Sequence, residues 1–157
     1  MKKIAVFPGS FDPVTIGHID IINRGLPLFD KMIIGIGVNS QKKYLFPIEK
    51  RISWLQKIFE FEPKIEVQSY TGLTVNFCET HLARYILRGI RSSGDFEFER
   101  AVSQTNRVLS RNIETIFILA NPSLASVSSS IVRDVIMNGG DPSPFIPEEI
   151  ENLVQRK

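Results

Sequence analysis

The chain alternates between short apolar runs and segments whose apolar residues recur at helical spacing. Nearly every residue of Lys31–Val38 is apolar, which is typical of a strand buried on both faces of a parallel sheet. Apolar or alternating runs predict strands over Lys3–Phe7, Lys31–Val38, Lys64–Ser69, Arg84–Leu87 and Glu114–Leu119. Helical spacing predicts helices over His18–Phe29, Ile48–Phe61, Leu73–Leu82, Phe96–Leu109, Ser128–Met137 and Glu148–Gln155. Pro27 should kink or shorten the first of these helices.

The order of these elements predicts the fold class. Strands that alternate with helices require right-handed crossovers, and these produce a parallel sheet with helices on both faces. We therefore expect the α/β class, as a Rossmann-like doubly wound fold with a five-stranded parallel sheet. No repeat, low-complexity tract or Pro/Gly/Ser-rich linker divides the chain, so we expect a single domain over residues 1–157.

Composition excludes several classes of protein. Hydrophobic residues make up 43% of the 157 residues and charged residues 23%, which is close to the average of soluble globular domains. The longest apolar stretch, around Met32–Val38, is far shorter than a membrane span. The single cysteine, Cys78, cannot form an internal disulfide, and no Cys/His group has the spacing of zinc ligands. The sequence therefore predicts a cytoplasmic protein with no metal site of its own and no membrane partner.

The charge pattern indicates a small ligand rather than a polymer. Nineteen basic residues against seventeen acidic ones give a net charge of +2, too little for a nucleic-acid-binding surface. The basic residues that stand out are local: Lys42, Lys43, Arg88 and Arg91. They favour a phosphorylated small molecule as the ligand.

The predicted fold limits where such a ligand can bind. In an open parallel sheet, ligands bind beyond the carboxyl ends of the strands, at the point where the strand order reverses. Most of the unusual polar residues fall in the segments that follow a predicted strand, which are Pro8–His18, Asn39–Pro47, Ser69–Thr74, Arg88–Asp95 and Ala120–Ser130.

The segment Pro8–His18 leads from the first strand into a helix that begins near Gly17-His18. Unpaired N–H groups and the helix dipole make such a helix start a seat for phosphate. The segment is neither a Walker loop nor the GxGxxG of dinucleotide-binding folds. Taken alone, the pair is weak evidence, because an isolated pair of this kind is more often a turn glycine followed by a solvated histidine in the first helical turn.

Basic residues follow two other strands. Lys42 lies in a loop that could hold a phosphate or could simply be solvated. Arg88 and Arg91 flank a glycine, and an arginine fork suits phosphate oxygens. The alternative is that these arginines form salt bridges with the nearby acids Asp95, Glu97 and Glu99. Both can hold, because an acid can orient an arginine that binds phosphate.

Ser128, Ser129 and Ser130 precede the helix that contains Arg133. A helix N-cap accounts for one serine of this run. It does not account for three, so we expect a second anion seat at this helix start. Trp54, by contrast, falls on the polar-leaning side of its helix and is given no role.

These blocks occur together and at regular spacing along essentially the whole chain: Pro8–Pro13, Thr15–His18, Lys42-Lys43, Leu87–Arg91, Asp95–Glu99, Asn106-Arg107 and Ser128–Ser130. In this combination the chain resembles the nucleotidyltransferase superfamily with a (His/Thr)-x-Gly-His signature. Within it, the chain resembles the bacterial phosphopantetheine adenylyltransferases. The resemblance implies transfer of an adenylyl group from ATP to 4′-phosphopantetheine, giving dephospho-coenzyme A and pyrophosphate. It also implies Mg²⁺, bound mainly through the ATP phosphates, and a homohexamer.

The resemblance further implies a role for each matching residue. His18, Lys42 and Arg88 would be catalytic, with His18 stabilising the α-phosphate in the transition state. The acceptor phosphate would be held by Ser10, Lys42 and Arg88, and the β- and γ-phosphates of ATP by Arg91, Ser129 and Ser130. The nucleotide site would be lined by Phe11, Gly17, Gly89, Glu99 and the segment Leu124–Ser130. The pantetheine arm would face Leu73, Thr74 and Asn106.

Two positions depart from the family pattern: Leu124 stands where many relatives have an aromatic residue, and Phe98 replaces a common tyrosine. Other functions also remain open on the sequence. A sibling enzyme could use nicotinamide mononucleotide or glycerol phosphate as acceptor, and a non-catalytic nucleotide sensor could share the fold. We expect the wall of Leu73, Thr74 and Asn106 to favour the uncharged pantetheine arm, whose amides need a polar partner. A cationic nicotinamide ring would instead call for aromatic stacking or carboxylates, which this stretch lacks.

Overall fold

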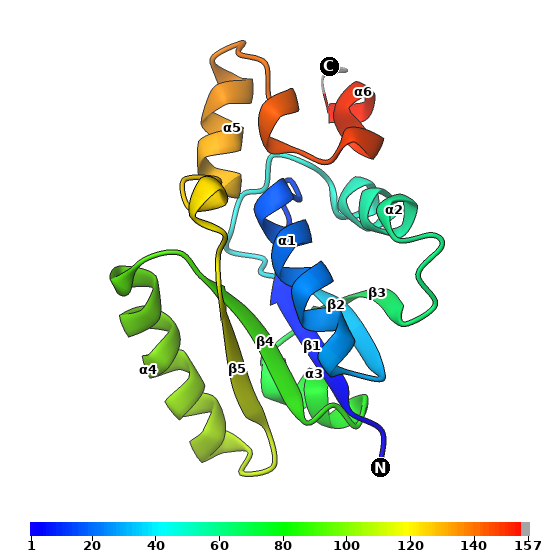
Figure 1. The fold of residues 1–157 in the computed structure, drawn as a ribbon, viewed down its shortest axis with the longest axis vertical. Coiled ribbons are helices and arrows are strands. Elements are labelled where there is room, and N and C mark those ends of the chain that lie inside the picture. The colour runs from blue at the N-terminus through cyan, green and yellow to red at the C-terminus, as the bar shows by residue number, and fades with distance from the viewer. Residues whose placement is uncertain (155–157) are drawn as a thin grey trace.

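Parallel strands form the centre of the molecule, in the order β3-β2-β1-β4-β5 (Figure 1). The computed structural model describes residues 1–154. Its strands are β1 (Ile4–Gly9), β2 (Lys31–Val38), β3 (Ile65–Thr71), β4 (Tyr85–Ile90) and β5 (Glu114–Leu119). The chain steps outward from β1 to β3 and then returns to the other side of β1, so the order reverses between β1 and β4. The expected doubly wound α/β fold with its five-stranded parallel sheet is confirmed.

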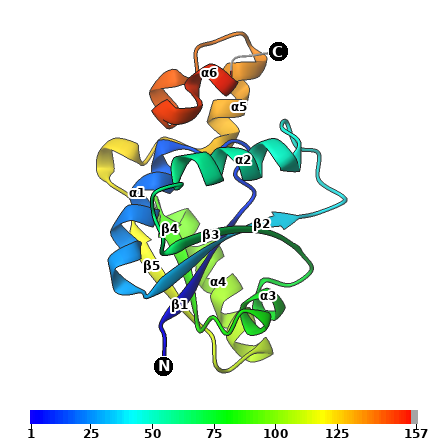
Figure 2. The same cartoon turned by 90° about the vertical axis from the view of Figure 1, so that its right-hand side faces the viewer.

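Helices cover both faces of the sheet, as Figures 1 and 2 show. One face carries α1 (Ile16–Gly25) and α2 (Ile48–Ile58), and the opposite face carries α3 (Thr74–Thr80) and α4 (Ser93–Leu109). Beyond the carboxyl ends of the strands lie α5 (Ser129–Met137) and the short α6 (Glu151–Val154). Short 3-10 turns occur at Leu26–Leu28, Pro122–Leu124, Ser143–Phe145 and Glu148–Ile150.

The alternation of side chains along each strand divides the core into two clusters. On β1, Ala5 and Phe7 face α1 and α2, whereas Val6 faces α3. Trp54 belongs to the larger cluster: it is 4% exposed and its ring lies 4.8 Å from that of Phe46. Its placement on the polar side of α2 was therefore wrong, because the loop before α2 folds back and covers it.

Some predicted boundaries shift, and the largest shift touches the site. The fourth strand was expected to end at Leu87, but β4 continues to Ile90 because Arg88–Ile90 pair with Phe117–Leu119 of β5. Arg88 and Gly89 are thus strand residues. The following helix begins at Ser93 rather than Phe96, since the Ser92 hydroxyl caps it by accepting from the Asp95 amide at 3.2 Å.

The ends of two helices also differ from the prediction. The helix expected over His18–Phe29 stops at Gly25 and continues as a 3-10 turn around Pro27, as the missing amide hydrogen of proline requires. The last predicted helix reached Gln155, which lies outside the described residues. The expectation of a single domain over residues 1–157 also stays a prediction, because residues 155–157 lie outside the described part of the chain. Among the helices of residues 1–154, none combines the length and apolarity that crossing a bilayer requires.

Candidate active site

Two adjoining cavities lie at the carboxyl edge of the sheet, on either side of the switch point between β1 and β4. The first has a volume of about 310 Å³ and the second about 410 Å³. They share one wall, formed by Pro8, Gly9, Ser10, Lys42, Arg88 and Glu99. Most of the residues that sequence reasoning selected therefore come together in one place.

The N-terminus of α1 positions His18 in the first cavity. Thr15, which is 1% exposed, caps the helix, and its amide donates to His18 Nδ1 at 3.0 Å. A backbone amide can only donate, so Nδ1 carries no proton and the neutral ring bears its hydrogen on Nε2. The prediction of a helix start at this pair is confirmed.

The electrostatics of the site keep this imidazole neutral. Partial burial of the ring, together with the positive charges of Arg88 and Arg91, lowers the pKa of His18 from 6.5 to about 4. At neutral pH the ring is therefore an uncharged hydrogen-bond donor in a cavity lined by cations. Such a donor can bind a phosphoryl oxygen without adding a third positive charge next to the two arginines.

Phe11 supports His18 rather than lining a cavity. The Phe11 side chain is 1% exposed, and its ring centroid lies 5.0 Å from that of His18. It is absent from the walls of both cavities. Sequence reasoning expected Phe11 in the nucleotide site; the structure instead places its side chain beneath the histidine, because a left-handed backbone (φ 48°) turns it inward.

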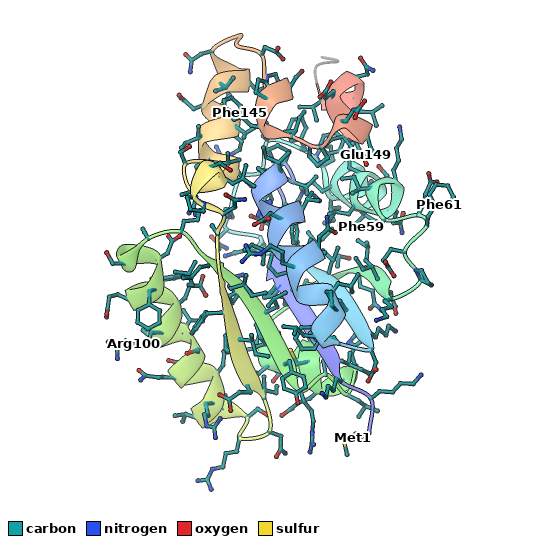
Figure 3. The ribbon with its side chains drawn as sticks, in the orientation of Figure 1. Met1, Phe59, Phe61, Arg100, Phe145 and Glu149 are labelled. Atoms are coloured by element: carbon teal, nitrogen blue, oxygen red, sulfur yellow. The ribbon has the colours of Figure 1, made fainter. Side chains whose placement is uncertain are left out.

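Arg88 extends from β4 to the wall that the two cavities share. Its Nε and Nη2 donate to the two carboxylate oxygens of Glu99 at 2.9 and 2.5 Å, and Nη1 donates to the Pro8 carbonyl at 2.5 Å. Glu97 pairs instead with Arg100, which lies on the outer side of α4 (Figure 3). Glu99 thus orients the guanidinium and leaves some of its N–H donors for a ligand.

Arg91 faces the first cavity alone. Its Nε donates to Asp95 at 3.0 Å and Nη1 to the Val127 carbonyl at 3.4 Å. The two arginines therefore each have an acidic partner on α4, which confirms the predicted ion pairs, and both also line the first cavity. That they bind phosphate stays a prediction.

The N-terminus of α5 forms the opposite wall of the first cavity. Ser128 caps the helix by accepting from the Ile131 amide, Ser129 donates to the Pro13 carbonyl at 2.8 Å, and Ser130 accepts from Arg133 at 3.1 Å. All three serines line the cavity. Arg133 lines it too, and sequence reasoning missed it; its position one turn after the serine run was the available signal.

Glycines admit the close approaches that this geometry needs. A Cβ on Gly89 would lie 2.9 Å from Ile21 of α1, so only glycine lets the helix pack this closely on β4. Gly17 has room for a Cβ, with its nearest neighbours at 3.5 and 3.6 Å. Its place in the cavity wall shows that a side chain there would instead occupy ligand space.

The second cavity lies between β1, β2, β3 and α4. Thr74 and Asn106 line it as expected, but Leu73 does not and is 52% exposed. Three aromatic residues that sequence reasoning did not place here also line it: Tyr44, Tyr70 and Phe98. The expectation of a wall without aromatic side chains was therefore wrong, because the topology brings these residues in from separate elements.

Known proteins of similar sequence identify the family of this chain. A family model described as cytidylyltransferase-like matches residues 6–135. A phosphopantetheine adenylyltransferase of Flavobacterium psychrophilum is 56% identical over 96% of this chain and 98% of its own. One of Crocosphaera subtropica is 44% identical over 94% of both chains. The chain belongs to the phosphopantetheine adenylyltransferase family.

Solved structures support the fold of this adenylyltransferase family member. A putative nicotinate-nucleotide adenylyltransferase from Vibrio parahaemolyticus superposes with a TM-score of 0.69 over 99% of this chain and 100% of its own, at 20% identity. A bifunctional NMN adenylyltransferase/ADP ribose pyrophosphatase from Francisella tularensis gives 0.72 over 98% of this chain and 49% of that one, at 16% identity. At these identities the likeness concerns the fold alone.

The carboxylates of the site are already engaged. Within residues 1–154 there is no group of three or more His, Cys, Asp or Glu side chains that could hold a metal ion. Asp95 and Glu99, the carboxylates that line the first cavity, each bind an arginine. A magnesium ion would therefore fit here only with the phosphates of a bound nucleotide, which is its usual mode in such sites.

Proposed function

We propose that this chain transfers the adenylyl group of ATP to 4′-phosphopantetheine, releasing pyrophosphate. The observation that carries the proposal is the shared wall of two cavities, with Ser10, Lys42 and Arg88 where the cavities meet. One cavity has the histidine and two helix N-termini, which suits a triphosphate. The other is larger and mixed in polarity, which suits a second substrate with a phosphate at one end.

In this proposal the chemistry is positioning and neutralisation of charge. Nucleotidyl transfer needs little covalent help from the protein, so no nucleophilic side chain is required. The acceptor phosphate, held by Ser10, Lys42 and Arg88, attacks the α-phosphorus in line. The Nε2 hydrogen of neutral His18 donates to the α-phosphate as negative charge develops on it.

The leaving pyrophosphate lies on the other side of His18. Arg91, Ser129 and Ser130 would bind the β- and γ-phosphates, and Arg133, which donates to Ser130, adds a further positive charge to this wall. Magnesium would arrive with these phosphates and neutralise part of their charge. Gly17, Gly89 and Leu124 would then border the nucleoside, as their positions in the first cavity allow.

The acceptor is supported by the relatives rather than by the wall of the second cavity. Aromatic side chains at Tyr44, Tyr70 and Phe98 could stack on a nicotinamide ring, so this wall does not discriminate between acceptors. Eight curated relatives at 44–56% identity over at least 92% of this chain are named phosphopantetheine adenylyltransferase.

A pyrophosphate-release assay tests the proposal. With Mg-ATP, 4′-phosphopantetheine should release pyrophosphate far faster than nicotinamide mononucleotide or glycerol phosphate. Equal or faster release with either competitor would replace the acceptor while keeping the phosphate sites. ATP binding without release with any acceptor would identify a nucleotide sensor.

The assembly and location of the enzyme complete the proposal. We place the reaction in the cytoplasm and the chain in a homohexamer, as the family resemblance implies. Exposed apolar side chains, Phe98 and Val108 on α4 and Leu119 on β5, are available for such contacts. Analytical ultracentrifugation of the full chain should give the mass of six copies, and a monomeric mass at micromolar concentration would contradict the assembly.

A further inference from the structure

A buried arginine lies behind the site without lining either cavity. Arg51 is the fourth residue of α2 and is 2% exposed, among the largest fully buried side chains of the described residues. Neither cavity includes it. Burial of a charge is costly unless other groups hold it, so its contacts should explain why it is there.

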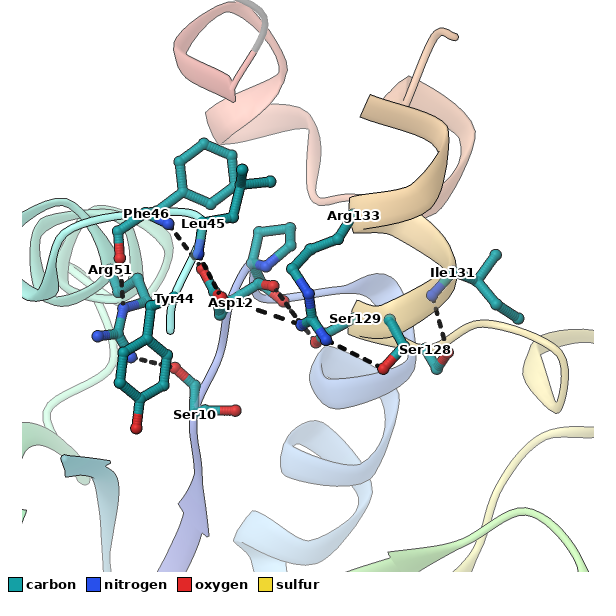
Figure 4. A network of polar contacts seen from close by, with 12 residues as sticks. Ser10, Asp12, Tyr44, Leu45, Phe46, Arg51, Ser128, Ser129, Ile131 and Arg133 are labelled. Atoms are coloured by element: carbon teal, nitrogen blue, oxygen red, sulfur yellow. Dashed lines mark hydrogen bonds and ion pairs between the residues drawn. The ribbon is translucent and has the colours of Figure 1, made fainter. Parts of the chain in front are cut away.

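Arg51 joins two loops of the site. Its Nε donates to the Phe46 carbonyl at 3.0 Å, and Nη1 donates to the Ser10 carbonyl at 2.7 Å. Its Cζ also lies 4.1 Å from the centre of the Tyr44 ring. Figure 4 shows the guanidinium between the β1–α1 loop, which carries Ser10, and the β2–α2 loop, which carries Lys42.

Asp12 holds the same two loops together with the opposite charge. Asp12 is 1% exposed, and its carboxylate accepts from the amides of Leu45 and Phe46 at 2.8 and 2.9 Å. Arg51 therefore binds a carbonyl of the 44–46 segment, while Asp12 binds two of its amides. The backbone of the 44–46 segment is therefore bound at its amides by Asp12 and at its Phe46 carbonyl by Arg51. The negative charge of Asp12 also stabilises the buried positive charge of Arg51.

Tyr44 carries this constraint to Lys42. Its hydroxyl accepts from the Asn39 amide at 3.0 Å and donates to the Gly37 carbonyl at 3.4 Å. The loop is thereby closed at its start as well as at its end. Lys42 lies inside the closed loop, with Nζ 5.6 Å from the same ring.

We propose that Arg51 is a positioning residue that fixes Ser10 and Lys42 relative to each other as one seat for the acceptor phosphate. Both of these residues lie in the wall that the two cavities share. Arg51 itself contacts neither seat on the ATP side: the α5 seat is tied to the β1–α1 loop through Arg133, which donates to the Asp12 carbonyl at 2.8 Å, and through Ser129, which donates to the Pro13 carbonyl. Loss of Arg51 should therefore impair the acceptor selectively. This inference rests on the proposed function, because it assigns the shared wall to the acceptor.

Steady-state kinetics of Arg51→Lys and Arg51→Met test the proposal. Lysine keeps the charge but replaces the rigid fork, whose Nε and Nη1 reach separate carbonyls, by a single ammonium nitrogen, and methionine keeps only the apolar stem. We expect KM for 4′-phosphopantetheine to rise about 10–100-fold in the methionine variant and less in the lysine variant, with KM for ATP within about threefold of wild type. A merely structural arginine predicts similar changes in both KM values, and that result would overturn the proposal.

Arg24→Met is the matched control. Arg24 also donates to a backbone carbonyl, that of Leu119 at 2.8 Å, and lines neither cavity. It should leave both KM values unchanged. If Arg51→Met does not fold, Tyr44→Phe replaces it: that variant keeps the ring under Arg51 and loses only the hydroxyl that closes the loop, and we expect about a 3–10-fold rise in the acceptor KM alone.

Hydrogen exchange provides a readout that needs no substrate. In Arg51→Lys, the amides of Leu45 and Phe46 should exchange at least about tenfold faster, while those of Ile33 and Ile34 in the sheet keep their wild-type rates. Uniform acceleration, or none, would overturn the positioning role. If wild-type protein released no pyrophosphate, the proposed function would fail, and the exchange result would still decide whether Arg51 fixes the loop.

Discussion

The two cavities are built in different ways. The first is walled by the N-termini of α1 and α5, where Thr15 and Ser128 cap the helices and regular backbone presents the donors. The second owes its shape to an irregular loop held by two buried charges, Arg51 and Asp12. Capped helix starts are held by short-range hydrogen bonds to their own cap residues, whereas a loop needs tertiary contacts to be equally rigid. Substitutions should therefore act locally in the first cavity and through intermediaries in the second.

The largest predicted effect concerns His18, which lines the first cavity but not the second. His18→Ala should lower turnover by about 10²–10³-fold while KM for ATP changes little, because its Nε2 hydrogen serves the transition state more than the bound substrate. Pyrophosphate release under saturating substrates measures this. His81→Ala changes the other histidine, which lines neither cavity, and should have wild-type turnover. Near-wild-type turnover of the His18 variant would remove the histidine from the mechanism.

The same residue makes stability depend on pH. The pKa of His18 is about 4 in the folded protein and 6.5 as an ordinary value, so below pH 6.5 the unfolded chain binds a proton that the folded one does not. The contribution of His18 to stability is therefore intact above pH 6.5 and is lost as the pH falls towards 4. From these two pKa values, the loss amounts to about 2 kcal/mol by pH 5.

Urea unfolding at pH 7.5 and pH 5 measures this loss, with His18→Asn as the comparison. Asparagine does not titrate, and its side-chain oxygen can still accept from the Thr15 amide. Between pH 7.5 and pH 5, the free energy of unfolding should fall by about 2 kcal/mol less for the variant than for the wild-type protein. Parallel pH profiles for the two proteins would show that the histidine is charged in the folded state.

The two arginines allow the cavities to be separated by ligand. Arg88 lies in the shared wall and Arg91 in the first cavity alone. Arg91→Ala should weaken ATP binding about 10–100-fold and acceptor binding less. Arg88→Ala should weaken mainly the binding of the acceptor. Calorimetry with each ligand distinguishes the two, and Arg100→Ala, which breaks only an outer ion pair with Glu97, is the control. The reverse pattern would mean that the two phosphate seats are exchanged.

The contrast between the cavities also explains what the sequence could and could not predict. Strands, helix starts and the serine cap follow from local pattern, so the fold and the first cavity were largely predictable. Arg51, Tyr70 and the exclusion of Leu73 were not, because they depend on which segments the topology brings together across tens of residues. The prediction for Phe11 was wrong for a related reason: its residue type suits the wall of a ligand site, but its left-handed backbone turns the ring into the core. Which ligand each placed residue binds stays a prediction.

The smallest expected effect concerns Leu124, which lines the first cavity at a position where the family resemblance implies an aromatic residue. Stacking of a base on an aromatic side chain is worth about 1–3 kcal/mol, and part of this is offset by the apolar contact that leucine already makes. Leu124→Phe should therefore lower KM for ATP only about threefold and leave KM for the acceptor unchanged. Leu28→Phe, a matched change at an exposed leucine of the 3-10 turn Leu26–Leu28 outside both cavities, should alter neither constant. A shift in the acceptor constant with Leu124→Phe would mean that the nucleoside does not lie against this residue, and that the two cavities are less independent than their construction indicates.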